Sequence, residues 1–328
     1  SEERTKNEAY AGLFRTIAEG STIKNLNIDI SGLLRTTSEV NLMLKEQRVP
    51  NIDLRKVSVV YFGVLAGQND GVVENVKVVN YGINGEKVLY VATTLGFYQV
   101  GEDNTTTTGH IGGLVGVNGG VIADSMVGVR NTKTVTISAY VNSKLTQRSQ
   151  STQSFTLMGG NNIAGLSAQN TGTISNSFTG KLSITNTTNI SVSSMTAGFV
   201  CQNSGKIYSC AVTTPDSDIV KLRSDSTIIK SSTTTAGFVH NNAGVIEDCY
   251  TNIQIENYNV ATAGFVYKNE EGASIVNAYT TTRNVAIDKN SKSHGLFVFE
   301  KPMYGTLLNA YYAIVDNELG LNIDTGEE

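Results

Sequence analysis

The histidines, cysteines and carboxylates of this 328-residue chain are the side chains that could do chemistry, and their spacing assembles no catalytic group. His110, His240 and His294 lie far apart, so none belongs to the close histidine pair typical of a zinc motif. The sequence also lacks a serine-centred nucleophile elbow, a phosphate loop and a dinucleotide fingerprint. We therefore expect no catalytic residues, no metal and no cofactor, and the chain is predicted not to be an enzyme.

The carboxylates recur at repeated positions rather than in pairs. Asp124 and Asp248 share one position of the repeat described below, and Glu74 and Glu247 share another, but other copies separate the members of each pair. Glycoside chemistry needs two carboxyl groups about 5–9.5 Å apart, and the repeat brings no such pair together. The remaining acidic clusters are interpreted as solvated loop residues: Asp216, Asp218, Asp225, Glu270 and Glu271.

The three cysteines do not form a disulfide framework, because an odd number excludes full pairing. Cys210 and Cys249 share one position of neighbouring repeats, which fits either a disulfide or a column of small residues. Cys201, His240 and Tyr267 share a second position. Two ligands do not make a metal site, so a ladder of neighbouring side chains is the simpler interpretation there.

A single phrase recurs along the chain and sets its organisation. It reads Ala-Gly-Leu or Ala-Gly-Phe in most copies, usually with valine next, and Asn-x-Gly, a β-branched residue and a polar residue follow. Copies begin at Ala11, Gly112, Ala164, Ala197, Ala236 and Ala263, with degenerate copies at Val64 and Gly295. Such self-similarity is typical of stacked repeat architectures.

Asn-x-Gly predicts a tight turn, because both residue types accept positive φ angles that strain other residues. The polar residue further on breaks the two-residue alternation and predicts a corner, after which a small residue points inward again. Each repeat is thus expected to form three strands joined by a turn and a corner. The predicted turn residues are Asn118, Gly120, Asn170, Gly172, Asn203, Gly205, Asn242 and Gly244.

These features predict an all-β fold, a parallel β-helix (solenoid) of about eight coils with long loop insertions between coils. The shortest spacing between motif glycines, from Gly237 to Gly264, fits one three-sided coil, whereas a propeller blade or a helix pair does not fit. Longer spacings place insertions at 133–159 and 213–235. The expected organisation is one solenoid domain over 1–328, part of a longer chain or an assembly, with irregular coils over 1–110, more regular coils over 111–312 and a tail over 313–328.

Stacked coils bring equivalent residues into columns. A large apolar residue follows the motif glycine, or Val64 in its place, in every copy and predicts an internal ladder, each member of which contributes roughly 1.5–3 kcal/mol when buried. The ladder residues are Leu13, Leu65, Leu114, Leu166, Phe199, Phe238, Phe265 and Leu296. Tyr250, Tyr279 and Tyr311 share an outward position, which predicts either a contact stripe for a partner or ordinary packing within a ladder.

Composition and charge reduce the classes of partner that the chain is expected to bind. The net charge of −4 and the pI near 5.5 give no electrostatic footprint for nucleic acid. No run of about 18 apolar residues is present, so no direct membrane insertion is expected. The expected partners are a protein, a glycan or neighbouring copies of the chain.

The repeat resembles a known family. The Gly-Leu-Val-Gly motif from Gly113 to Gly116, followed by Asn-x-Gly at Asn118 and Ile-x-Asn at Ile174, is similar to the GLUG-type repeat of bacterial surface proteins. Such repeats occur in filamentous-haemagglutinin-like adhesins and in the non-catalytic part of IgA-specific metallopeptidases. The resemblance covers most of the chain and implies a structural repeat on the bacterial surface. The His-Glu-x-x-His of those peptidases is absent here.

Three functions remain open. The first is a non-enzymatic, extracellular or cell-surface adhesin-like module that binds through exposed loops and faces. The second is a structural subunit of a filament or of a phage-type receptor-binding assembly, since solenoid ends expose strand edges. The third is a glycan-active β-helix lyase or hydrolase.

Overall fold

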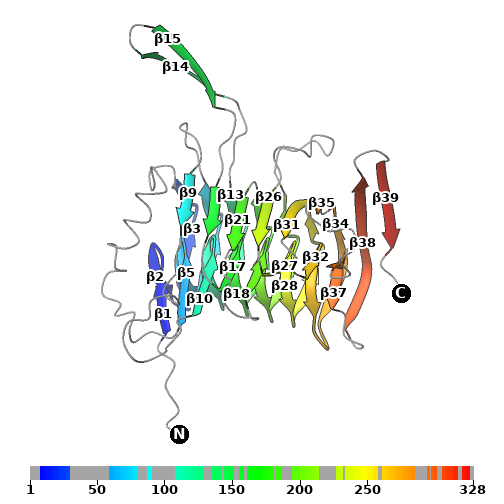
Figure 1. Cartoon of the computed structure of the whole chain (residues 1–328). Coiled ribbons are helices and arrows are strands. Elements are labelled where there is room, and N and C mark those ends of the chain that lie inside the picture. Colours follow the sequence, from blue (N-terminus) through cyan, green and yellow to red (C-terminus); the bar gives the residue numbers. More distant parts are fainter. Residues whose placement is uncertain are drawn as a thin grey trace, which may run out of the picture.

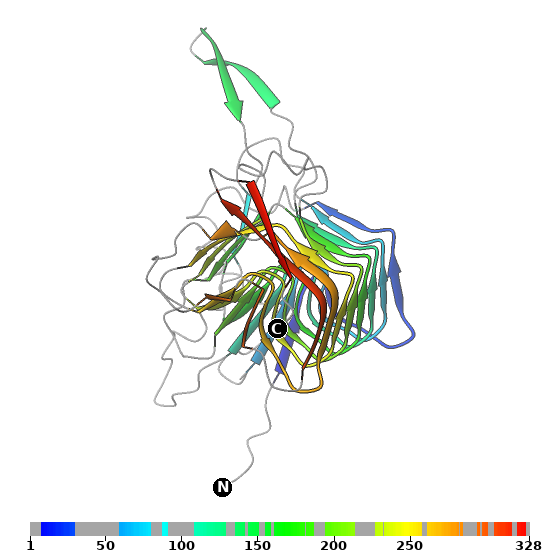
Figure 2. The ribbon, with the colours of Figure 1, turned by 90° about the vertical axis from the view of Figure 1, so that its right-hand side faces the viewer.

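The chain folds as a parallel β-helix. The computed structural model describes residues 8–29, 59–79, 87–90, 108–128, 135–141, 144–150, 155–158, 161–180, 182–186, 194–213, 227–231, 233–257, 261–281, 283–284, 294–295, 297–300, 305–316 and 320–325. Within these residues all regular structure is β, and strands of successive repeats pair in parallel. They lie side by side along one axis (Figure 1), and the coils superimpose when viewed along that axis (Figure 2). The fold class is the one predicted.

The motif lies in two eight-stranded parallel sheets, A and B. Each of the eight coils contributes one strand to each of these sheets. Sheet A consists of β1 (Glu8–Ala11), β5 (Val59–Gly63), β10 (Thr108–Gly112), β17 (Asn162–Ala164), β22 (Met195–Ala197), β27 (Thr234–Ala236), β32 (Thr262–Ala263) and β36 (His294–Gly295). Sheet B consists of β2 (Phe14–Ile17), β6 (Ala66–Asn69), β11 (Val115–Asn118), β18 (Ser167–Asn170), β23 (Val200–Asn203), β28 (Val239–Asn242), β33 (Val266–Asn269) and β37 (Val298–Glu300).

Sheet C follows the Asn-x-Gly turn and contains two strands of each coil, before and after the corner. The strands before it are β3 (Thr22–Lys24), β7 (Val72–Glu74), β12 (Val121–Ala123), β19 (Thr173–Ser175), β24 (Lys206–Tyr208) and β29 (Val245–Glu247). Those after it are β4 (Asn27–Asp29), β8 (Lys77–Val79), β13 (Met126–Gly128), β20 (Phe178–Gly180), β25 (Ala211–Val212) and β30 (Tyr250–Thr251). β34 (Ser274–Thr280) and β38 (Thr306–Asp316) run through the corner, and β39 (Gly320–Thr325) pairs antiparallel with β38.

The coil is not three-sided, because the one strand expected before the Asn-x-Gly turn is divided between sheets A and B, and a fourth sheet, D, was not predicted. It contains β9 (Lys87–Tyr90), β16 (Phe155–Met158), β21 (Leu182–Asn186), β26 (Thr227–Ser231), β31 (Ile253–Asn257) and β35 (Arg283–Asn284). β16 and β26 lie inside the two predicted insertions, which are therefore partly solenoid. The first insertion also contains an antiparallel hairpin of β14 (Val135–Val141) and β15 (Lys144–Gln150), which projects from the coils (Figure 1).

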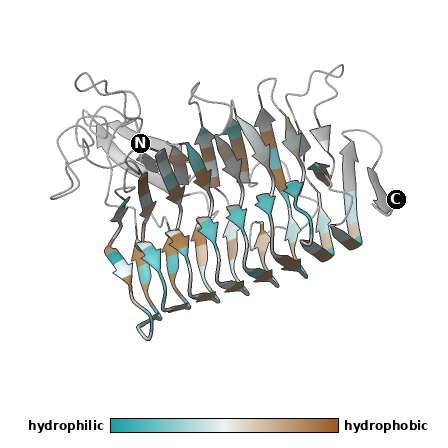
Figure 3. Cartoon of the chain, turned by 90° about the horizontal axis from the view of Figure 1, so that it is seen from below, coloured by the Kyte–Doolittle hydropathy of each residue, from teal (hydrophilic) through white to brown (hydrophobic). Residues whose placement is uncertain are grey.

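The core is a set of columns, and polar and apolar positions recur from coil to coil (Figure 3). The rings of Phe199, Phe238, Phe265 and Phe297 stack with centroids 4.7–4.8 Å apart. The motif leucines and phenylalanines at the centre of this spine are fully buried: Leu65, Leu114, Leu166, Phe199, Phe238 and Phe265. The strand spacing of a parallel sheet thus places identical side chains in direct contact.

The ladder prediction was wrong for Leu13, which is 61% exposed. In the first coil only two residues separate Ala11 from Phe14, whereas three separate their partners Phe62 and Ala66, so the corner is one residue short. Leu13 therefore cannot reach the interior. Leu296 lies outside the described residues; Gly295 pairs with Ala263, and Phe297 fills the ladder position in that coil.

The Asn-x-Gly residues form the turn, but for a different reason from the one predicted. The asparagines are buried, and each side-chain Nδ2 donates to the Oδ1 of the next coil at 2.7–2.8 Å along Asn69, Asn118, Asn170, Asn203, Asn242 and Asn269. The glycines have ordinary φ angles. A Cβ on Gly172 would overlap the carbonyl oxygen of Gly120, so glycine is needed for close approach between coils.

Positive φ occurs instead at the corner. Eight non-glycine residues there have φ between 46° and 57°: Asn25, Asn75, Asp124, Asn176, Ser209, Asp248, Asn277 and Asn309. Asparagine and aspartate tolerate this conformation best. The small residue that follows has its own role, because the hydroxyls of Ser125 and Ser177 donate to the carbonyls of Ala123 and Ser175 and close the corner.

Candidate binding surfaces

The outward faces of sheets A and B meet along a seam at the motif corner. Its deepest column contains only small residues, including Ala164, Ala197, Ala236 and Ala263, all of which are fully buried. The neighbouring motif glycines allow the coils to approach, since a Cβ on Gly198 would overlap the carbonyl oxygen of Gly237. This explains the Ala-Gly pair of the repeat: alanine fills the seam and glycine permits the bend.

In the first three coils the large side chains of the seam come from sheet A. The rings of Tyr10, Tyr61 and His110 stack with centroid distances of 5.2 and 4.8 Å. Sheet B provides glycine opposite the two tyrosines: a Cβ on Gly67 would overlap the backbone of Tyr10 and Ala11, and one on Gly116 the backbone of Tyr61 and Phe62. The Tyr10 hydroxyl donates to Glu8 at 2.6 Å.

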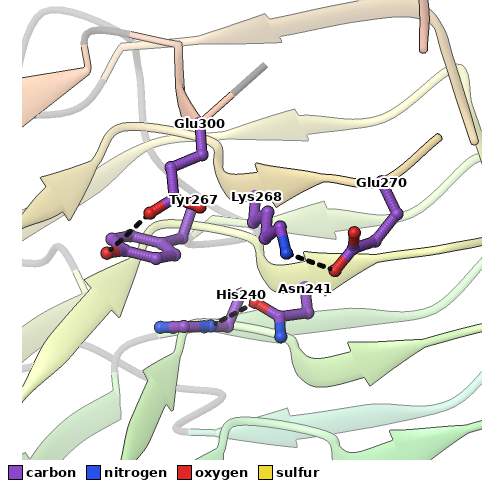
Figure 4. Close-up of polar contacts among 6 residues, drawn as sticks. All are labelled: His240, Asn241, Tyr267, Lys268, Glu270 and Glu300. Atoms are coloured by element: carbon purple, nitrogen blue, oxygen red, sulfur yellow. Dashed lines mark hydrogen bonds and ion pairs between the residues drawn. The ribbon is translucent and has the colours of Figure 1, made fainter. Parts of the chain in front are cut away.

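In the last coils the arrangement is reversed, with the rings on sheet B. His240 stacks on Tyr267 at 4.4 Å and Tyr267 on Phe299 at 5.1 Å. The side chain opposite is small, and His240 Nε2 lies 2.8 Å from the Thr234 hydroxyl. Figure 4 shows the polar rim, where Lys268 forms an ion pair with Glu270 at 3.0 Å. Large and small residues thus alternate between the walls so that the seam stays filled.

Both described histidine side chains belong to this seam, and burial keeps them neutral. Desolvation lowers the pKa of His110 to about 4, although Glu8 opposes that shift, and it also lowers the pKa of His240 to about 4. Asn162 Nδ2 lies 3.1 Å from His110 Nδ1, and Asn241 Oδ1 lies 2.8 Å from His240 Nδ1. These bonds hold the rings in a structural role.

The three thiols are free and buried. Burial raises the pKa of Cys201, whose Sγ donates to the carbonyls of Ile163 and Met195 at 3.2 and 3.6 Å. Burial also raises the pKa of Cys249, beside Cys210. Each of these two thiols donates to the carbonyl two residues earlier, as the serines of the same column do. A thiol with a raised pKa is a poor nucleophile, so Cys201 and Cys249 serve packing here.

The carboxylates singled out in the sequence are not brought together. Glu74 and Glu247 stand in one exposed column, but the strands β12, β19 and β24 lie between theirs. Asp124 and Asp248 occupy corners of different coils, and Asp248 accepts from the Nδ2 of Asn277 at 2.9 Å. Among the residues that the structure describes, no group of three histidine, cysteine or acidic side chains could hold a metal ion.

The tyrosine stripe lies on the outer face of sheet C. Tyr250, Tyr279 and Tyr311 pair in register and are 37%, 38% and 37% exposed. The rings of Tyr250 and Tyr279 stack 5.6 Å apart at an angle of 20°. They stack along the solenoid axis, so each ring presents its edge and hydroxyl outward. Burial and the nearby Tyr250 hydroxyl raise the pKa of Tyr279, which keeps the phenol neutral.

A second row runs parallel to the stripe on the other side of the corner. It consists of Tyr208, Glu247, Val276 and Leu308, which pair in register. Tyr208 is 41% and Leu308 47% exposed. Because β34 and β38 pass through the corner, both rows belong to one continuous sheet. We call the two rows together the tyrosine face.

No family model, no curated protein and no solved structure matches this chain. Its internal repeat and its surfaces are therefore the basis for assigning a role. The described part of the chain also holds no helix with the length and apolar character of a membrane span.

The seam was missed by the sequence reasoning, although a signal for it exists. Tyr61 and His110 each stand two residues before a glycine, Gly63 or Gly112, and a second glycine, Gly67 or Gly116, stands in the next strand. Reading these two positions as a pair would have found it. The position shared by Cys201, His240 and Tyr267 was correctly predicted to form a ladder. The sequence did not show that this ladder packs against sheet A.

Proposed function

We propose that this protein is a non-enzymatic binding module on the extracellular or cell-surface side of a bacterium, adhesin-like in role. The tyrosine face is its contact surface. The observation that carries the proposal is the distribution of exposed apolar side chains. Of the eight large ones in the described residues, five lie on this face: Tyr208, Tyr250, Tyr279, Leu308 and Tyr311.

The chemistry of the face supports this role. Contiguous exposed apolar groups rimmed by polar residues mark interaction sites on soluble proteins. Tyrosine provides large contact area with little conformational entropy to lose, and the ladder pre-organises these rings further. The resemblance of the repeat to GLUG-type surface proteins agrees with an adhesive role. The buried neutral histidines, and the thiols of Cys201 and Cys249 with their raised pKa values, are not activated for catalysis.

The proposal is tested by binding to arrays of glycans and extracellular proteins. We expect the protein to bind a discrete set of ligands, and Tyr250→Ser with Tyr279→Ser to weaken that binding about tenfold or more, as loss of central interface aromatics does. Val121→Ser is the matched control, because Val121 is 38% exposed on the same sheet but outside the face. If the double variant binds as the wild type does, the proposed surface is wrong.

A structural subunit is the second candidate, because sheets A and B end at β1, β2, β36 and β37, each of which pairs with a described strand on one side only. Open edges favour strand addition by another chain. Sedimentation velocity over a range of concentrations separates the two roles. A monomeric rod supports the binding module, and growth into end-to-end polymers supports the subunit.

A further inference from the structure

We infer that the tyrosine face binds a protein surface bearing arginine or lysine among apolar side chains, and not a sugar ring. This inference rests on the proposed function and specifies its partner. It follows from the orientation of the rings and from the charges beside them.

The ring orientation disfavours sugars. A sugar stacks on an aromatic residue through the open face of the ring. Here one face of Tyr250 is covered by Tyr279, and Tyr311 follows in register on the other side of Tyr279. Before Tyr250 the column holds the small Ala211, so one ring face is open at that end of the stripe, and the rest of the stripe presents ring edges and hydroxyls. Ring edges carry partial positive charge and hydroxyls donate and accept, so the stripe suits side chains and backbone groups of a protein.

The second row supplies the apolar part of the contact. Val276 and Leu308 follow Tyr208 along the axis and offer no hydrogen-bonding group. Two aliphatic side chains beside a row of phenols match the mixed core of protein interfaces, in which tyrosine and other aromatic residues are enriched.

The charge of the face selects the partner. Glu247, in the second row, and Asp248, at the corner between the rows, are adjacent and exposed, and neither forms an ion pair with a described residue. Lys206, two residues before Tyr208 in the preceding coil, is exposed and forms no ion pair with them. Two carboxylates without a counter-charge complement cationic side chains, and arginine, with its planar fork, is enriched at interfaces.

The test uses the full chain and two peptides that differ only in charge. One contains leucine, tyrosine and arginine, and the other has glutamate in place of arginine. A neutral oligosaccharide is the third probe. We expect the arginine peptide to bind about tenfold or more tightly than its glutamate form at low salt, and its affinity to fall as salt is added.

The decisive variant is Glu247→Gln with Asp248→Asn. Asparagine stands at the same corner in Asn176 and Asn277, with the same positive φ, so the fold is retained. We expect this variant to lose the preference for the arginine peptide. Glu74→Gln is the matched control, because Glu74 is exposed in the same column four coils away.

Three results overturn the inference: equal binding of both peptides, a preference that survives the double variant, or binding of the oligosaccharide alone through Tyr250. These outcomes are distinct from failure of the binding role. If tyrosine variants lose array binding while peptide charge has no effect, the module binds through this face but its partner is of another kind.

Discussion

At the scale of single residues, the absence of a side chain at the motif glycine allows neighbouring coils to stack closely. A Cβ on Gly198 would overlap the carbonyl oxygen of Gly237, and backbone atoms on both sides cannot move without breaking the sheet. We expect Gly198→Ala to lower the free energy of unfolding by about 3 kcal/mol, the upper end of overpacking costs, as measured by urea denaturation. Gly119→Ala is the control, because its Cβ would meet only the movable side chain of Asp70 closely. Equal effects of the two substitutions would contradict the close-approach explanation.

The contributions of the buried asparagine ladder and of the exposed corner asparagine to stability can also be distinguished by mutation. Asn170→Ala leaves the Oδ1 of Asn203 and the Nδ2 of Asn118 without their ladder partners in the interior, at a cost of about 2–4 kcal/mol in unfolding free energy. Asn176→Gly, at the exposed corner, is expected to cost less than about 1 kcal/mol, because glycine accepts positive φ. Thermal or urea unfolding of the two variants checks this order. A reversed order would mean that the corner, and not the ladder, stabilises the coil.

At the scale of elements, the seam between sheets A and B makes stability depend on pH. The folded-state pKa values of His110 and His240 are about 4, below the ordinary 6.5, so the unfolded chain binds more protons between those values. Stability is therefore complete above pH 6.5 and is lost as pH falls towards 4, by at most roughly 3 kcal/mol for each histidine. The groups facing these rings are Glu8, Tyr61, Asn162, Thr234, Asn241 and Tyr267.

Urea denaturation at pH 7 and pH 4.5 measures this loss. The variant His110→Asn with His240→Gln should be less stable at pH 7 but show a smaller difference between the two pH values. Carboxylates elsewhere titrate equally in both proteins, so the comparison isolates the histidines. An unchanged pH dependence in the variant would place the acid sensitivity outside the seam.

Elements also show how far the sequence could be read. Sheets B and C and the phenylalanine spine lie within the repeated phrase, so its columns predicted them directly. Sheet A ends at the first residue of the phrase, as β22 does at Ala197, and was not predicted as a separate strand. Sheet D lies outside the phrase at variable distance from it: β21 follows soon after its motif, whereas β26 follows a longer segment. The seam was hidden because its large side chains change sheets along the axis, from Tyr61 to Tyr267, so no single column records it. The prediction for Leu13 failed because the corner of the first coil is one residue shorter than in the next coil. This changes the orientation of the Leu13 side chain, although the motif sequence is unchanged.

At the scale of the whole molecule, stability is a sum over coils and the contacts between neighbours, as in other solenoids. Residues 237–263 make up one whole coil between equivalent motif positions, and their removal joins Ala236 to Gly264 and restores Ala-Gly-Phe-Val. Phe199 would then face Phe265 and Asn203 would face Asn269, both like-for-like replacements. We expect this shortened chain to fold, with β-type circular dichroism and one cooperative unfolding transition.

Removing 237–250 instead is the matched disruption, because it deletes about half a coil and places sheet D residues, beginning at Ile253, opposite sheet B residues, beginning at Val200. The shortened coil would then match neither of its neighbouring coils, and we expect that chain to be unfolded or aggregated in size-exclusion chromatography. If both deletions behave alike, contacts between distant coils must carry the fold. The nearest-neighbour stacking seen in the phenylalanine and asparagine columns would then not be what holds the molecule together.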